Sequence, residues 1–101
     1  MWVITMFDLP TDTKAERREY ARFRKALLED GFTMMQFSVY VRHCASIENA
    51  DLHIRRMAAQ TPPEGEVRFL TITDRQYGKI QTFWGKKRQP ARLSPSQLEL
   101  F

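Results

Sequence analysis

The sequence predicts an α+β fold in one domain, with two helices packed on one face of an antiparallel sheet. Three observations predict it: apolar runs with strand alternation, two segments with apolar residues at helical spacing, and the order in which these segments follow one another. The 101 residues, 43% of them hydrophobic, suffice for one core but not for two. We therefore expect a domain over residues 1–85, followed by a basic tail over residues 86–101.

The first predicted strand, residues 2–8, is an apolar run that ends on a carboxylate. Alternation places Asp8 on the same face as three apolar side chains, those of Trp2, Ile4 and Met6. A carboxylate in such a row is costly unless it is paired, hydrated or bound to a metal. Two interpretations follow. Asp8 is a metal ligand or general base at a strand end, or it caps the turn around Pro10 or the helix that follows.

The first helix is predicted between Thr13 and Gly31. Thr13 and Glu16 have the spacing of a capping box, and Gly31 supplies a left-handed stop. The apolar side of the helix carries Tyr20, Phe23 and Leu27. Another side carries a basic stripe, Lys14, Arg18, Arg22 and Lys25, flanked by Arg17 and Arg24. This pattern suits contact with phosphates, and the alternative is an ordinary solvated helix face with local acidic partners.

Three further strands and a second helix complete the expected domain. Residues 32–43 are rich in β-forming side chains and too long for one ordinary strand, so we divide them near Gln36. The second helix starts at Ser46 and ends before the Pro62-Pro63 pair. Its apolar positions are Ile47, Ala50, Ile54, Met57 and Ala58. Residues 66–73 form the next predicted strand.

The order strand, helix, two strands, helix, strand is that of a ferredoxin-like βαββαβ sandwich. An additional C-terminal strand is predicted over residues 80–84, after a tight segment at residues 74–78. Because the helices leave one sheet face uncovered and several strands are apolar on both sides, we expect a homodimer. The additional strand then pairs with its own sheet or with the partner's. A two-fold axis near the first strand would bring two copies of Asp8 together, which suits a magnesium site.

The net charge of +4 favours an acidic partner such as nucleic acid. The tail of residues 86–101 holds a net +3 and residues 1–85 only +1. Within the tail, Lys86, Lys87 and Arg88 form a second candidate nucleic-acid contact. Residues 93–101 alternate apolar and polar side chains after Pro95, which predicts either a short docking strand or a disordered end.

Other side chains support less specific expectations. Asp12 and Asp74 are expected as turn or cap residues, and His43 and His53 as packed or surface histidines rather than metal ligands. Cys44 has no partner for an internal disulfide, no stretch is long and apolar enough to span a membrane, and the N-terminus lacks the features of a signal peptide. These features predict a cytoplasmic protein without a membrane partner.

Three motifs of this chain resemble the CRISPR-associated protein two family. They are residues 6–10 (MFDLP), 36–42 (QFSVYVR) and 71–77 (TITDRQY), and the resemblance runs in order from about Val3 to Arg88. This family supplies the small ferredoxin-like partner of the CRISPR adaptation integrase. The resemblance therefore implies a prokaryotic protein of spacer acquisition, a homodimer in which the late strand joins the partner's sheet.

The resemblance also implies the partners and the site residue. In the family, the dimer bridges two integrase dimers, and basic side chains hold the backbone of a prespacer DNA duplex. Several members are described as metal-dependent nucleases acting on single-stranded RNA or double-stranded DNA, with an aspartate at the end of the first strand as the metal-binding catalytic residue. On matching position that residue is Asp8, and the cofactor is Mg²⁺ or another divalent cation.

We therefore expect a sequence-independent DNA adaptor with a latent Mg²⁺-dependent phosphodiesterase site, and a functional endonuclease acting on RNA or DNA is the alternative. Asp8 is the only acid in the first strand, which predicts one carboxylate per subunit and a weak metal site. A free-standing RNA-binding domain is disfavoured, because neither central strand carries a run of exposed aromatic side chains for base stacking.

Overall fold

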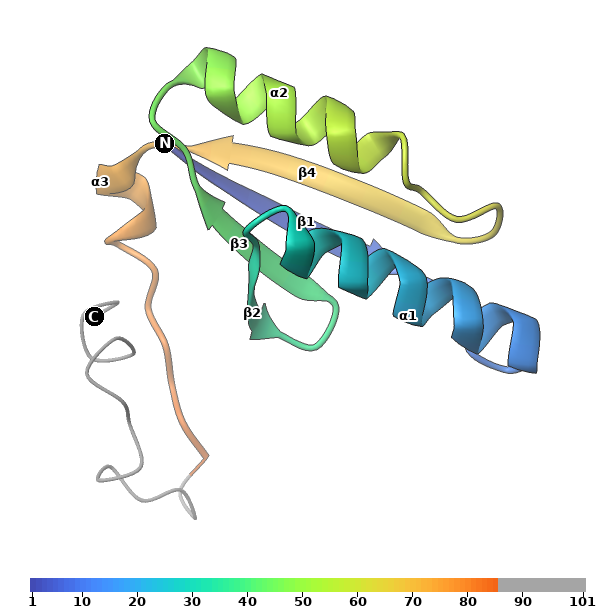
Figure 1. Ribbon diagram of the computed structural model, residues 1–101. Coiled ribbons are helices and arrows are strands. Elements are labelled where there is room, and N and C mark those ends of the chain that lie inside the picture. Colours follow the sequence, from blue (N-terminus) through green and yellow to red (C-terminus); the bar gives the residue numbers. More distant parts are fainter. Residues whose placement is uncertain (86–101) are drawn as a thin grey trace.

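The computed structural model describes residues 1–85, which form a four-stranded sheet and three helices (Figure 1). The elements are β1 (Trp2–Asp8), α1 (Lys14–Glu29), β2 (Thr33–Gln36), β3 (Val39–His43), α2 (Ile47–Ala58), β4 (Glu66–Ile72) and α3 (Asp74–Tyr77). The strand order is β2-β3-β1-β4, and every neighbouring pair is antiparallel. The predicted ferredoxin-like βαββαβ arrangement is confirmed.

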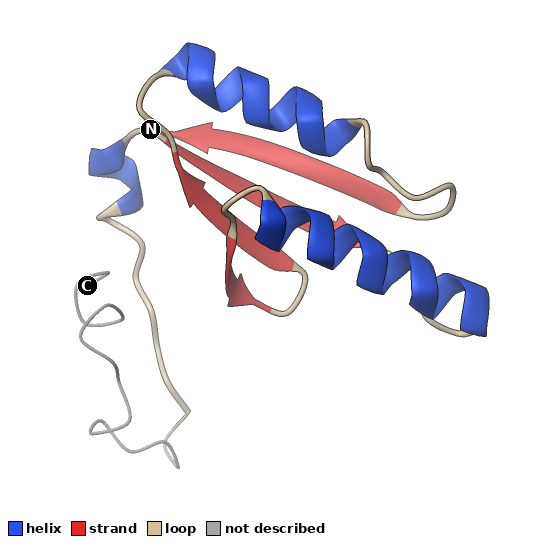
Figure 2. Cartoon of the chain, viewed as in Figure 1, coloured by secondary structure: helices blue, strands red, loops and turns tan. Residues whose placement is uncertain are grey.

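Helices α1 and α2 lie on one face of the sheet (Figure 2). On the other face, the short helix α3 covers one end, where Tyr77 stacks on Trp2 with ring centroids 3.7 Å apart, and the described residues place no helix over the rest of that face. The predicted alternation in β1 is confirmed. Val3, Thr5 and Phe7 are buried, whereas the residues between them are partly exposed and Asp8 is exposed. Asp8 therefore lies on the face that α1 and α2 do not cover.

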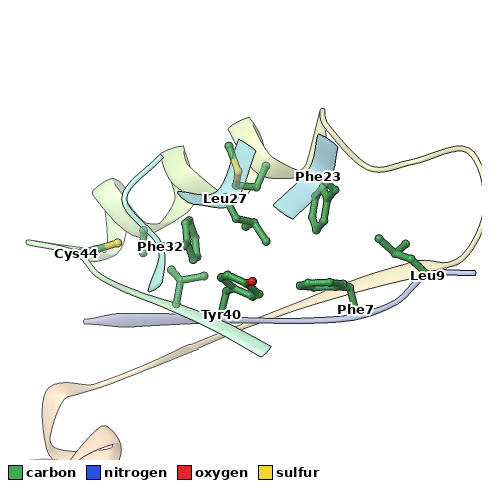
Figure 3. Packing of buried hydrophobic residues seen from close by; sticks show 10 residues of the cluster. Phe7, Leu9, Phe23, Leu27, Phe32, Tyr40 and Cys44 are labelled. Carbon is green, nitrogen blue, oxygen red and sulfur yellow. The ribbon is translucent and has the colours of Figure 1, made fainter. Parts of the chain in front are cut away.

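The core fills the space between the helices and the sheet (Figure 3). Its largest fully buried side chains include Phe23 and Leu27 from α1, Phe32 from the following turn, and Tyr40 from β3. Burying each such side chain contributes roughly 1.5–3 kcal/mol. This packing holds α1 against the sheet and so determines which side of α1 faces solvent.

The predicted ends of α1 are confirmed. The Thr13 hydroxyl accepts a hydrogen bond from the backbone N–H of Glu16, and the Glu16 carboxylate accepts one from the backbone N–H of Thr13. Gly31 follows the helix with a φ of 94°, a left-handed value that favours glycine. The division of residues 32–43 is also confirmed, because a turn with Ser38 at a φ of 63° separates β2 from β3.

The buried side of α2 differs from the prediction at Ile47, His53 and Ala58. Ala58, the last residue of the helix, is exposed. Ile47 is 56% exposed, because it is the first residue of the helix and stands at the end of the packed stripe. His53, which is not one of the predicted apolar positions, is buried on the same side of the helix as Ala50 and Met57. Helical spacing indicated the correct side of α2, but it did not show where packing stops.

The additional strand predicted over residues 80–84 is absent from the single chain, where residues 80–85 form neither helix nor strand. A strand needs an edge to pair with. The short helix α3, which was expected only as a tight segment, turns the chain away from the edge strand β4 (Figure 1). The predicted docking strand near the C-terminus lies outside the described residues.

Candidate functional site

Asp8 ends β1 with an exposed side chain on the uncovered sheet face. Within residues 1–85, its carboxylate makes no hydrogen bond or ion pair, and the N-cap of α1 is Thr13. The interpretation of Asp8 as a cap is therefore wrong. The carboxylate is exposed and available to a ligand, as the metal-ligand interpretation requires.

Glu66, the first residue of β4, lies directly opposite Asp8 in the antiparallel ladder. Directly paired residues have Cα atoms about 4.5–5.5 Å apart and their side chains on the same face. Two like charges at this spacing destabilise the ladder unless a cation compensates them. The Arg68 guanidinium supplies part of that compensation, with its Nε 3.2 Å from the Glu66 carboxylate. The chain thus presents two carboxylates at this strand end, not the single one expected.

Gly65 allows β4 to begin beside Asp8. Its φ is 91°, and a Cβ atom at this position would lie 2.5 Å from the backbone oxygen of Asp8 and 2.9 Å from a methyl group of Leu9. No real Cβ contact is that short. Glycine is therefore required for the close approach that places Glu66 opposite Asp8.

The carboxylate pair suits a hard divalent cation. Mg²⁺ is commonly bound by one or two carboxylates, with water and substrate phosphates as its other ligands. No group of three or more metal-ligating side chains gathers anywhere in the part of the chain that the structure describes. Asp8 and Glu66 can therefore hold Mg²⁺ only as a weak, largely hydrated site.

The basic stripe on α1 is exposed, and its members differ in their partners. Within residues 1–85, Lys14 and Arg18 have no ion-pair or hydrogen-bond partner for their side chains. Lys25 lies 3.9 Å from the Glu29 carboxylate, an exposed contact that contributes less than about 1 kcal/mol. Lys14, Arg18 and Lys25 are therefore available to phosphates.

The remaining arginines of α1 have structural partners. Arg22 contacts the carboxylate of Glu19 and donates to the backbone oxygen of Gln60, which ties α1 to the end of α2. Arg17 donates to the backbone oxygens of residues 11 and 12 and so braces the loop before α1. Arg24 donates to the Tyr40 hydroxyl. Their sequence spacing alone could not separate these roles from phosphate contact.

The two candidate features lie on opposite sides of the sheet. The basic stripe belongs to α1, which covers one face, whereas Asp8 and Glu66 project from the other face. A nucleic acid held along α1 is therefore not held against Asp8 of the same chain. Lys86, Lys87 and Arg88, the second predicted contact, lie outside the described residues.

The predicted caps Asp12 and Asp74 are each one residue away from the actual N-caps, which are Thr13 and Thr73. Asp74 instead accepts from the amino group of Met1 at 2.8 Å and lies 3.2 Å from Nε2 of His43. The hydrogen bond from the amino group and the neighbouring His43 lower the pKa of Asp74 below its ordinary value of 3.8. The ionised Asp74 carboxylate therefore stabilises the fold above pH 4, and this stabilisation is lost as the pH falls through the lowered pKa.

His53 is packed, as predicted, with its Nδ1 2.7 Å from the Asp30 carboxylate, and His43 is a surface residue. Neither histidine joins Asp8. Among the described helices, none is long and apolar enough to cross a membrane.

Comparisons with known proteins identify the family. The family model described as CRISPR associated protein Cas2 matches residues 1–80. Two curated relatives named CRISPR-associated endoribonuclease Cas2 come from Parvibaculum lavamentivorans and Flavobacterium psychrophilum. The first is 71% identical over the whole of both chains, and the second is 46% identical over all of this chain and 88% of the relative. The crystal structure of Streptococcus pyogenes Cas2 at pH 6.5 has a TM-score of 0.62 at 21% identity, and covers 83% of this chain and 100% of that one.

Proposed function

Because this chain belongs to the Cas2 family of CRISPR-associated proteins, we propose that it is a homodimeric adaptor of spacer acquisition that bridges integrase dimers and holds prespacer double-stranded DNA. The observation that carries the proposal is the outward side of α1, where Lys14 and Arg18 are exposed and have no partner within residues 1–85. These cations stand away from Asp8, so the proposed holding of DNA needs no metal chemistry.

Cations on the outside of a helix contact the phosphate backbone, which carries no sequence information directly. Binding of this kind releases counterions from the duplex, so its affinity falls steeply as the salt concentration rises. We therefore expect duplexes of unrelated sequence to bind with similar affinity, and each lost phosphate contact to lower the salt slope by about one.

The experiment measures duplex binding in EDTA, by fluorescence anisotropy at several salt concentrations, for the unaltered chain and a Lys14→Glu/Arg18→Glu variant. We expect the variant to lose at least about tenfold in affinity and to show a shallower salt dependence. The control is an Arg55→Glu/Lys79→Glu variant, which makes the same charge change at exposed positions outside α1. Equal losses in both variants would refute a role for α1, and binding that requires Mg²⁺ would refute the metal-independent adaptor.

A second candidate function is a metal-dependent endonuclease. Two observations favour it: the adjacent carboxylates of Asp8 and Glu66, and the name endoribonuclease that both relatives carry. Mg²⁺ bound there would polarise a phosphodiester and activate a water molecule. Arg68, beside Glu66, stands where it can donate hydrogen bonds to a phosphate near the carboxylates.

Metal binding can be measured without cleavage, by electron paramagnetic resonance of added Mn²⁺. We expect Asp8→Asn and Glu66→Gln each to weaken binding by at least about tenfold, because each removes one of two carboxylate ligands. Glu64→Gln is the matched control, since Glu64 is a nearby exposed acid outside the ladder. Unchanged Mn²⁺ affinity in Glu66→Gln would contradict the two-carboxylate site. Cleavage of RNA or DNA that Mg²⁺ restores after chelation would establish the enzyme.

A further inference from the structure

A pocket of about 150 Å³ lies beside α1, on the side of the sheet that the helices cover. The residues after β1, the first turns of α1 and the loop between α2 and β4 form its walls. Figure 1 places these segments at the same end of the molecule. Its apolar walls include Leu9, Ala15, Tyr20 and Pro62. Nothing in the metal site or the basic stripe uses it.

The volume of the pocket limits what can enter it. An apolar cavity of about 150 Å³ is large enough to bind a benzene molecule. One aromatic ring or one branched aliphatic side chain therefore fills the pocket. The pocket opens to the surface, because Ala15 and Pro63 in its wall are exposed. A side chain can enter without displacing the core.

The charges around the pocket indicate the chemistry of the occupant. Glu16, Glu19 and Glu64 line it together with the apolar side chains. Glu19 contacts Arg22, whereas Glu64 has no ion-pair partner within residues 1–85. Carboxylates at the edge of an apolar pocket repel phosphates, so a nucleic acid is disfavoured there. They attract lysine and arginine, so a cationic peptide is favoured.

We propose that this pocket docks a cationic peptide segment of a partner protein, which inserts one aromatic or branched aliphatic side chain between α1 and the α2–β4 loop. An apolar anchor in a pocket surrounded by complementary charges is a common arrangement of strong interface contacts. The inference does not depend on the chemistry at Asp8 or on DNA binding by Lys14 and Arg18.

The positions around α1 allow both surfaces to be used together. Ala15, Glu19 and Tyr20 face the pocket, whereas Lys14 and Arg18 belong to the stripe on another side of the same helix. A peptide in the pocket and a duplex on the stripe would approach α1 from different directions. The sheet face with Asp8 also stays open to a second copy.

The test is a titration of the full, isotope-labelled chain, followed by backbone amide shifts. The probe is a blocked peptide, Lys-Arg-Gly-Trp-Gly-Arg-Lys. One matched peptide has alanine in place of tryptophan, and another has glutamate in place of every lysine and arginine. We expect the first peptide to shift amides around Tyr20 and Glu64, and each matched peptide to bind at least about tenfold more weakly. Equal binding of all three, or shifts confined to other surfaces, would overturn the proposal.

Variants separate the pocket from general charge attraction. Ala15→Trp is expected to fill the pocket from within and to abolish binding. Glu64→Lys should weaken binding several-fold, whereas Asp51→Lys, the same change at an exposed position on α2, should not. An unchanged Ala15→Trp titration would overturn the proposal. A peptide of residues 86–101 that binds more tightly than the cationic probe would show that this chain's own tail is the occupant, which would also overturn it.

Discussion

Asp30 is the most buried acid among the described residues, with its carboxylate only 2% exposed. One carboxylate oxygen lies 2.7 Å from Nδ1 of His53, and the other lies 2.9 Å from the Arg56 guanidinium. Its backbone oxygen accepts a hydrogen bond from Arg42. A single residue at the end of α1 thereby joins α1 to α2 and to β3.

Removing the Asp30 carboxylate should destabilise the fold strongly. Asp30→Ala leaves His53 buried without its partner and Arg56 without its anion, and breaking a buried pair in this way costs roughly 3 kcal/mol. Urea unfolding followed by circular dichroism measures the change in the free energy of unfolding. Asp51→Ala, which removes an exposed acid from α2, is the control and should change it little. A loss below about 1 kcal/mol for Asp30→Ala would show that the pair contributes no more than a surface contact.

For single residues, the sequence predicts which face of the sheet a side chain lies on better than it predicts which residue that side chain contacts. Alternation alone placed Asp8 on the uncovered face, because successive side chains of a strand point to opposite sides. Glu66 was missed, because its position opposite Asp8 depends on the ladder register, which two separate strands do not reveal. The sequence offered one indication: Glu66 is the first residue of a predicted strand, and the start of a strand antiparallel to β1 lies near the end of β1. The Asp30–His53 pair likewise depends on how α1 and α2 pack.

Among the elements, capping chemistry predicted the helix boundaries well. Thr13 and Gly31 mark the ends of α1 because their side-chain and backbone preferences act locally. The strand predicted at residues 80–84 does not form in the single chain, because a strand needs an edge to pair with and α3 turns the chain away from β4. Its pairing with a partner's sheet stays a prediction. Capping residues therefore predicted where a helix begins and ends, but they could not predict which strands pair.

The turn into β4 depends on Gly65 in the same local way. Gly65→Ala should destabilise the fold by about 1–3 kcal/mol, because a Cβ atom would meet the Asp8 backbone and the left-handed φ disfavours alanine. Thermal and urea unfolding measure this change. Gly78→Ala is the control, because Gly78 has a φ of −66° that alanine adopts easily. Equal stability of the two variants would mean that β4 can begin elsewhere without cost, and that Glu66 does not need to lie opposite Asp8.

For the whole molecule, the uncovered sheet face is the feature that a single chain leaves unexplained. Ile4 on β1 and Leu70 on β4 are paired in the ladder and lie on this face, and Leu70 is 48% exposed. Phe83, in the segment after α3, is 86% exposed. A second copy packed on this face would cover these side chains and would offer an edge for residues 80–84. The proposed homodimer thus accounts for the open face and for the missing strand.

A charge on the uncovered face should therefore separate the subunits. We expect the unaltered chain to have twice its 12.0 kDa mass by light scattering after size exclusion, and Leu70→Glu to have the mass of one chain. The reason is that burying an unpaired carboxylate in an apolar interface costs several kcal/mol. Leu52→Glu is the matched control, because Leu52 is 42% exposed on α2 and should leave the dimer intact. Circular dichroism of Leu70→Glu must stay that of a folded chain, since in the monomer this position faces solvent. If Leu70→Glu remains a dimer, the subunits associate through another surface, and the two Asp8 carboxylates need not lie near a common axis.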